Sequence, residues 1–419
     1  MVFDGTHYLA GYVAGTTLLG QRFDASGRLV GGPITIGSGL GWPPGAAFAL
    51  GGPNVLVAWS TADGLMQARL VPPDGSPGPV ISLGSGGQVR AVASDGANFL
   101  VVHTTGDEEQ DGPAYGVYVS GAGQVLGQPF MLGDGVADLA VAYGGGNYLA
   151  AWQEPRGEGD SWTVARLVSP AAGPVGGPVT LSTTRSWDHN PLAIGFDGES
   201  FLVLWNCTTN FDGPGELMLY GRRVSSMGIP LGDELVIAEE RATFPAIAFD
   251  GSHYLVVWSH QSMEGTTIHA RWLDRTGRPV GPVFTPLAPA GDEPPFLPLN
   301  GLAFDGSRFV LAATFGHFVL LPSGEPVGFV GDVRGAFLSA STAPPRFVSY
   351  GLTNGFPMAQ IRLVPGITYS VEVSTNLPVF VKAGEIYSAD TNVLTVVDEQ
   401  PADEQPHEFF RLVAEDGQP

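Results

Sequence analysis

The sequence contains little cysteine, little charge and no long apolar run. Its 419 residues include one cysteine, Cys207, which excludes an internal disulfide and any zinc site built from several cysteines. No run of 18 uncharged apolar residues occurs, so we expect no membrane insertion. A signal peptide is also missing. Because Met1 falls inside the first of a series of repeats, we expect that a leader has been removed.

Basic residues are scarce relative to acidic ones. The chain has 19 lysines and arginines against 41 aspartates and glutamates, which gives a formal net charge of −22. This charge repels phosphate backbones and anionic lipid headgroups, so it argues against nucleic acid or a membrane surface as a partner. The P-loop, the Rossmann glycine pattern and the G-x-S-x-G nucleophile elbow are absent from the sequence as well.

Glycine and proline, in contrast, are abundant, with 60 and 35 residues in a chain that is 44% hydrophobic. This composition predicts many short strands joined by tight turns, and no segment has a convincing helical pattern. One phrase recurs along the chain, and at 250–258 it reads Asp-Gly-Ser-His-Tyr-Leu-Val-Val-Trp. Its counterparts begin at Asp4, Gly51, Asp95, Gly144, Asp197 and Asp305. A spacing of roughly 50 residues is typical of the four-stranded blades of a β-propeller.

Four features share the register of this repeat, and each predicts one strand. A segment of small residues precedes the phrase and suits an inner strand near a crowded axis. The phrase itself leads into a strand that is apolar on both faces, as packing between two neighbouring blades requires. A third strand carries a small residue followed by arginine, and an outer strand with prolines follows a glycine turn. The recurring large residues are Trp59, Trp152, Trp205 and Trp258, and the arginines are Arg69, Arg166, Arg222 and Arg271. One arginine per blade suits hydrogen bonding between blades.

The sequence therefore predicts an all-β fold, a seven-bladed β-propeller followed by a small antiparallel β-sandwich-like domain. We place the propeller at residues 1–343 and the second module at 344–419, where the period is lost and strand patterns of another kind follow. The first repeat has almost no inner strand, and residues 333–340 offer one. We expect this segment to join the first blade and close the ring.

The repeat phrase resembles repeats found in large secreted proteins of environmental bacteria. The run from Gly366 to Leu377 and the Phe409-Phe410-Arg411-Leu412 segment are similar to C-terminal modules of such proteins, although Val379-Phe380 stands where those modules usually carry a tryptophan. The resemblance implies an extracellular or cell-surface location. It carries no catalytic motif, so it implies nothing about activity.

Function is expected on one face of the disc. The turns between the first and second strands and between the third and fourth are uniformly short, whereas the loops on the opposite face vary in length, and binding residues usually lie on such loops. Candidate ligand-binding residues on this variable-loop face are Trp42, Trp162, Trp187, Asp188, His189 and Phe296. Aromatic rings there could stack on sugars, or they could simply cap the contacts between blades.

The sequence offers two kinds of candidate metal site. Asp107, Glu109 and Asp111 offer oxygen ligands for calcium, but their loop lacks a calcium-loop pattern, so a solvated acidic loop is the simpler interpretation. Several histidines would form a site only if they met at the axis; the candidates are His103, His189, His260 and His269. We expect no other cofactor.

Three hypotheses for function follow. The first is a non-catalytic extracellular binding protein, monomeric, with a protein or carbohydrate ligand. The second is a carbohydrate-active enzyme, a glycosidase or polysaccharide lyase, that uses carboxylates such as Glu154, Asp160 or Asp188. The third is a structural spacer in a surface protein.

Overall fold

The structure is a computed structural model of residues 1–419. It describes all of them except 42–44, 106–111, 156–160, 184–191, 209–216, 240, 263–264, 288–294, 297–300, 321–325, 339–345, 354–355, 363–367, 377–378, 388–392, 398–408 and 415–419. Every regular element in the described part is a β-strand, as the glycine and proline content predicts. Among these residues there is no helix with the length and apolar character needed to cross a bilayer.

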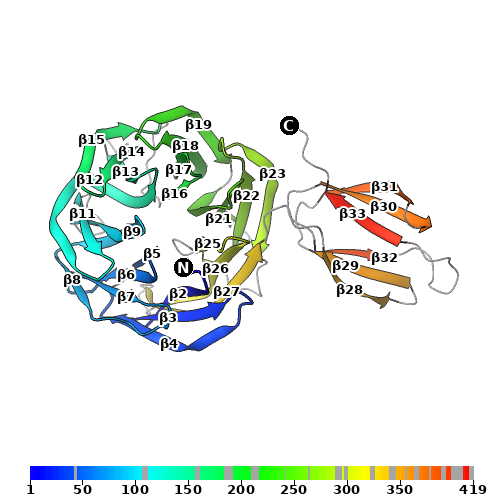
Figure 1. The fold of residues 1–419 in the computed structure, drawn as a ribbon, viewed down its shortest axis with the longest axis horizontal. Coiled ribbons are helices and arrows are strands. Elements are labelled where there is room, and N and C mark those ends of the chain that lie inside the picture. The colour runs from blue at the N-terminus through cyan, green and yellow to red at the C-terminus, as the bar shows by residue number, and fades with distance from the viewer. Residues whose placement is uncertain are drawn as a thin grey trace.

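Six four-stranded antiparallel blades follow one another around a ring (Figure 1). The first blade is β1 (Val2–Phe3), β2 (His7–Ala14), β3 (Thr17–Asp24) and β4 (Leu29–Ser38). The second is β5 (Ala46–Gly51), β6 (Asn54–Ser60), β7 (Leu65–Val71) and β8 (Ile81–Ser85). The third is β9 (Gln88–Ser94), β10 (Asn98–Thr104), β11 (Gly112–Ser120) and the first part of β12 (Val125–Gly144). In each blade the strands lie in sequence order from the axis outward, as the repeat predicts.

The remaining blades repeat this order. The fourth is the second part of β12 with β13 (Asn147–Pro155), β14 (Ser161–Ser169) and β15 (Gly173–Thr180). The fifth is β16 (Ala193–Phe196), β17 (Ser200–Thr208), β18 (Leu217–Ser225) and β19 (Pro230–Ala238). The sixth is β20 (Ala242–Phe249), β21 (Tyr254–Ser262), β22 (Gly265–Leu273) and β23 (Pro279–Leu287). Strand β12 pairs with β11 through its first half and with β13 through its second, so one strand serves two blades.

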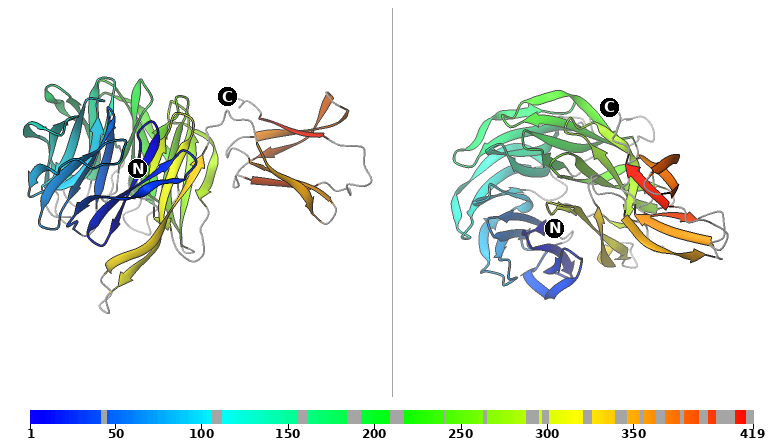
Figure 2. Two further views of the ribbon diagram at one scale, coloured as in Figure 1. Left: turned by 60° about the horizontal axis from the view of Figure 1, so that its bottom comes forward. Right: turned by 45° about the vertical axis from the view of Figure 1, so that its right-hand side comes forward.

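The last sheet of the ring is different. Strands β24 (Pro295–Phe296) and β25 (Leu302–Phe304) pair with one edge of β26 (Phe309–Leu320), and β27 (Pro326–Leu338) pairs with the other edge. Because β24 and β25 share one edge of β26, the described part of this sheet is only three strands wide from the axis outward, although it contains four strands. The hairpin of β26 and β27 is long, and its far end extends beyond the other blades (Figure 2).

The expected closure by residues 333–340 is wrong. Val333–Leu338 belong to β27 and pair with Phe309–Thr314 of β26, and not with the first blade. Pairing across a hairpin closes a short loop, whereas pairing with the first blade would join segments more than 300 residues apart, at a larger entropic cost. The alternating pattern of these residues fits both partners, so the sequence alone could not separate them.

Side chains of the first blade and the last sheet close the ring instead. The Tyr8 hydroxyl donates to Asp305 Oδ2 at 2.5 Å, and Arg308 donates to the backbone oxygen of Ala25 and to the same Asp305 oxygen. Burial alone would raise the pKa of Asp305. The hydrogen bonds from Tyr8, from Ser307 and from backbone amides outweigh burial and hold that pKa below its usual range.

We expect Asp305→Ala to destabilise the ring more than Asp250→Ala, by about 1–3 kcal/mol, because it leaves the Tyr8 hydroxyl without its acceptor. Asp250 is a matched control. It accepts the same turn hydrogen bonds from residues 252 and 253, but its Oδ2 has no partner in the described part of the chain. Thermal unfolding followed by circular dichroism measures both variants. Equal losses would show that Tyr8 adds nothing to closure.

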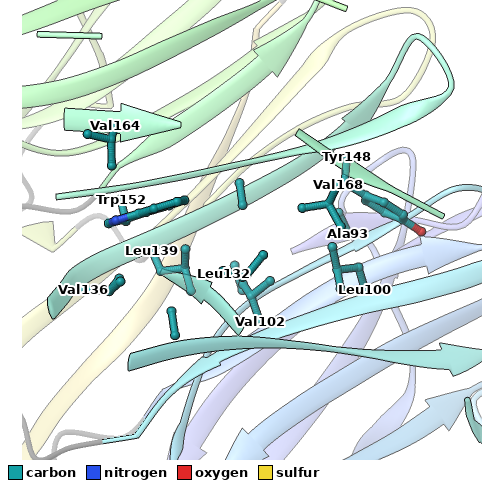
Figure 3. Close-up of a cluster of buried hydrophobic side chains, with 13 residues drawn as sticks. Ala93, Leu100, Val102, Leu132, Val136, Leu139, Tyr148, Trp152, Val164 and Val168 are labelled. Carbon is teal, nitrogen blue, oxygen red and sulfur yellow. The ribbon is translucent and has the colours of Figure 1, made fainter. Parts of the chain in front are cut away.

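The core is a series of apolar layers between neighbouring blades. One layer joins Leu100, Val102 and Leu132 of the third blade to Leu139 and Trp152 of the fourth (Figure 3). The four repeated tryptophans are at most 1% exposed. Trp59 lies against the outer strand of the first blade, where a Cβ added to Gly37 would be 2.5 Å from the indole ring. The tryptophan column therefore joins each of these blades to the one before it.

The repeated arginines also join neighbouring blades, which confirms the prediction made for them. Arg166 Nη1 donates to the backbone oxygen of Leu132 at 2.8 Å, and Arg222 Nη1 donates to that of Leu181 at 2.7 Å. Arg69 and Arg271 make the same contact with Thr35 and Ile237. Each of these acceptors belongs to the outermost part of the preceding blade.

The C-terminal part consists of two three-stranded antiparallel sheets. One contains β28 (Arg346–Thr353), β29 (Phe356–Arg362) and β32 (Val393–Val397), and the other contains β30 (Thr368–Asn376), β31 (Val379–Tyr387) and β33 (Phe409–Ala414). The sequence predicts strands at 369–374, 393–398 and 409–413, which correspond to β30, β32 and β33, whereas the strand predicted at 361–364 overlaps β29 only at its end. The sequence analysis did not identify β28 and β31.

Candidate functional site

The two faces of the ring differ in how uniformly they are built. On one face, five of the seven repeat anchors are aspartates whose Oδ1 accepts the backbone amides two and three residues further on. Asp95, for example, accepts from Ala97 and Asn98 at 2.8 and 2.6 Å. The glycine after each aspartate has a positive φ, such as 100° at Gly251, which an L side chain rarely adopts. This face is therefore built from copies of the same rigid turn.

The opposite face carries connections of unequal length. Between the second and third strands lie residues 15–16 in the first blade, 105–111 in the third and 209–216 in the fifth. The inner strands begin at this face, because the start of β9 pairs with the end of β10, Gln88 opposite Thr104. Variable connections on a repeated scaffold make this face the candidate functional site, as the sequence analysis expected.

Buried polar residues occupy the ends of the second strands on this face, directly after the tryptophan column. Thr104, Gln153, Asn206 and Ser259 are each less than 5% exposed. Ser60, at the same place in the second blade, accepts the Val89 amide of the next blade at 2.8 Å, and Asn206 donates to the backbone oxygen of Ala242 in its next blade. At Ser60 and Asn206, hydrogen bonds therefore join neighbouring blades beside the tryptophans, which join them through packing.

Three inner strands are bulged where they begin. Arg90, Asp138 and Phe244 have no ladder partner, because the register shifts beside each of them. Asp138 and Phe244 stand six residues before their anchors, and they are the only non-glycine residues with positive φ in the described part of the chain, at 39° and 51°. Backbone of this kind is strained and is frequent at binding sites, where bulges redirect side chains. We call these three residues the axial rim.

The three residues of the axial rim are a cation, a carboxylate and an aromatic ring. Arg90 and Asp138 are partly buried, and Phe244 is 39% exposed. Arg90 Nε donates to Thr104 Oγ1 at 3.0 Å. None of these three residues was predicted from the sequence. Alignment of the seven repeats could have found Arg90, since it is the only basic residue in the described inner strands.

The histidines lie in two separate places. His103 takes the tryptophan position in the third blade, is 4% exposed and stacks on Tyr115 at 5.7 Å between ring centroids. Burial lowers its pKa to about 4. His260 and His269 stack on each other in the sixth blade, with ring centroids 4.5 Å apart. No group of three or more metal-ligating side chains forms among the described residues.

Most candidate residues from the sequence cannot be placed. Trp42, Trp187, Asp188 and His189, and the calcium candidates Asp107, Glu109 and Asp111, lie outside the described residues. Trp162 lies in β14 and pairs with Glu154 of β13, while the backbone of Phe296 in β24 pairs with Thr314. Trp162 and Phe296 thus belong to the fourth blade and the last sheet, on the strand ends of the variable-loop face.

No protein-family model and no curated protein sequence matches the chain. Among solved structures, it is similar to a structure reported in an analysis of two prolyl endopeptidases, with 14% identity and a TM-score of 0.43; the match covers 86% of this chain and 55% of that one. The chain thus spans about half the length of that protein. An α-L-arabinofuranosidase from Lactobacillus brevis matches with 12% identity and a TM-score of 0.35 over 56% of this chain and 92% of the other. Similarity at this level carries no argument about function.

Proposed function

We propose that the chain is a non-catalytic binding propeller that takes a protein or carbohydrate ligand on its variable-loop face. The observation that carries this proposal is the contrast between the two faces. One face repeats the same rigid aspartate turn, whereas the other combines unequal connections with the strained, bulged axial rim. A scaffold held so regularly between its blades suits the display of varied loops.

The proposal includes a seventh blade and a separate module. The sheet of β24, β25, β26 and β27 takes the seventh place in the ring, and Tyr8 and Asp305 connect it to the first blade. We assign residues 1–343 to the propeller and 344–419 to a module in which the two three-stranded sheets pack as a β-sandwich. An extracellular or cell-surface location and a monomeric state complete the proposal, with calcium held by the loop of Asp107, Glu109 and Asp111 as an optional addition.

A glycan array probed with the full chain tests this function, together with two variants. Trp162→Ala alters the variable-loop face, and Met227→Ala alters a turn on the uniform face, where Met227 is 73% exposed. We expect Trp162→Ala to weaken binding of any retained glycan at least about tenfold, since truncation of an aromatic hot-spot residue costs about 2 kcal/mol or more, and Met227→Ala to leave it unchanged. The reverse pattern would place the site on the other face. An array without any signal would favour a protein partner over a carbohydrate.

A further inference from the structure

We propose that Arg90 binds the single carboxylate of a ligand at the axial rim. This inference rests on the proposed function, because it names the chemical group of the ligand that one residue of the same face binds. Three steps support it: the way the bulge presents Arg90, the hydrogen bonds its guanidinium makes, and the charges around it.

The bulge sets Arg90 apart from the rest of its strand. In β9, Ala91 pairs with Val102 and Val89 pairs with His103, so Arg90 is left between them without a partner. The inner strand is the one nearest the axis (Figure 1), and a bulge there changes the direction of its side chain relative to its neighbours. Bulges stand at the same end of the inner strands at Asp138 and Phe244, so the feature belongs to the rim as a whole.

A hydrogen bond to a neutral hydroxyl positions the guanidinium group of Arg90, and its charge is not paired with a carboxylate in the described residues. The side chain of Thr104, a residue that is 3% exposed, accepts from Nε through Oγ1 at 3.0 Å, and within the described residues it is the only hydrogen-bond partner of the Arg90 side chain. The other arginines that join blades donate to backbone oxygens, as Arg166 and Arg222 do. The two terminal nitrogens of Arg90 make no hydrogen bond within the described residues, so both can donate to another acceptor. This fork matches the two oxygens of a carboxylate.

The surrounding charge limits the ligand to few negative groups. The chain has a net charge of −22, and Asp138 stands at the bulge of the inner strand in the next blade. The negative charge of the protein would repel a polyanion along its whole length. A ligand with one carboxylate carries a single negative charge, and the Arg90 cation pairs with it. The chemistry is therefore one carboxylate on an otherwise neutral body, such as a sugar acid or a peptide C-terminus.

Ligand-observed NMR with the full chain tests the inference with defined probes. The sugar arm compares galacturonic acid with its methyl ester, and the peptide arm compares an N-acetylated tetrapeptide with its C-terminal amide. We expect saturation transfer to at least one free acid and none to its neutral counterpart, and the arm that responds identifies the source. Polygalacturonate is the third probe. Binding to it that is tighter than to either monovalent acid and depends on Arg90 would overturn the single-carboxylate assignment.

Variants separate Arg90 from its surroundings. We expect Arg90→Gln to weaken binding of the acid that responds about 10- to 100-fold, as loss of a charged hydrogen bond does, and Arg90→Lys to weaken this binding less. Arg241→Gln is the matched control, because Arg241 is an exposed cation directly before inner strand β20 but stands outside a bulge. Thr104→Val should weaken binding by loosening Arg90, and Thr104→Ser should restore it.

Further results would also overturn the inference. One is that no free acid binds, and another is that Arg241→Gln weakens binding as much as Arg90→Gln. A third is that Arg90→Gln lowers the melting temperature strongly at low salt and not at high salt, which would make Arg90 an internal ion-pair partner. Array binding that survives Arg90→Gln would also exclude this role for Arg90 while leaving the proposed function in place.

Discussion

Replacing Trp59 by alanine is expected to lower the free energy of unfolding by about 3–5 kcal/mol, the range found for large aromatic side chains in cores. Trp59 is fully buried, and it is one of four tryptophans that occupy this position in their blades. Its ring lies against Gly37 at a distance that leaves no room for a Cβ. Truncation therefore opens a cavity between the first and second blades that the rigid sheets cannot collapse to fill.

Two variants show whether packing is the cause. The indole nitrogen of Trp59 has no hydrogen-bond partner in the described part of the chain, so Trp59→Phe loses only volume and should cost less than alanine. Trp162→Ala removes a tryptophan that is partly exposed and lies outside the column, and we expect a loss below about 1.5 kcal/mol. Urea unfolding followed by far-ultraviolet circular dichroism measures all three. A Trp162→Ala loss as large as that of Trp59→Ala would contradict the special role of the column.

The same column shows how far the sequence could predict the fold. Four blades repeat tryptophan at one place and arginine at another, and both sets join neighbouring blades in the structure. Such positions are predictable because each blade meets the same physical requirement, a large ring and a donor facing the blade before it. The repeat thus gave the strand order of six blades without error. The last sheet departs from it, since β26 and β27, with 12 and 13 residues, are longer than the second and third strands of the six blades.

Other features could not be predicted in this way. The closing contact of Tyr8 with Asp305 joins residues 297 positions apart, and tyrosine also stands at this position in other blades, where Tyr254 interacts with Asp197 of the preceding blade. The axial rim depends on bulges, and a bulge shifts the register by one residue without any change of composition. Arg90 and Phe244 were therefore missed, although their strands were predicted. Residues that follow the repeat build the scaffold, and residues that depart from it form the axial rim of the candidate site.

His103 is the departure with the largest expected effect on stability, because it places a titratable ring where other blades have tryptophan. The ring nitrogens have no hydrogen-bond partner among the described residues, and a Cβ added to Gly87 would lie 3.1 Å from Nδ1. Desolvation disfavours the charged imidazolium, which is why burial lowers the pKa to about 4 from 6.5. The folded chain therefore resists protonation that the unfolded chain accepts.

The sign of the pH effect follows from this difference. Above pH 6.5 the imidazole is neutral in both states, so stability is highest there with respect to this group. As the pH falls from 6.5 towards 4, the unfolded state binds the proton first, and the folded state loses stability, by about 2 kcal/mol at pH 5 and about 3 kcal/mol once both states are protonated. This loss is separate from that of the carboxylates, which follows at lower pH.

The variant His103→Phe isolates the contribution, because phenylalanine keeps a flat ring against Tyr115 and cannot be protonated. We expect the difference in unfolding free energy between this variant and the wild type to be constant above pH 6.5 and to grow in favour of the variant by about 2 kcal/mol at pH 5. Trp152→Phe changes the same column in the next blade without removing a titratable group, so its profile should run parallel to that of the wild type. A parallel profile for His103→Phe as well would mean that His103 gains a proton acceptor or water on protonation. The third blade would then tolerate the charged ring that its apolar surroundings are expected to exclude.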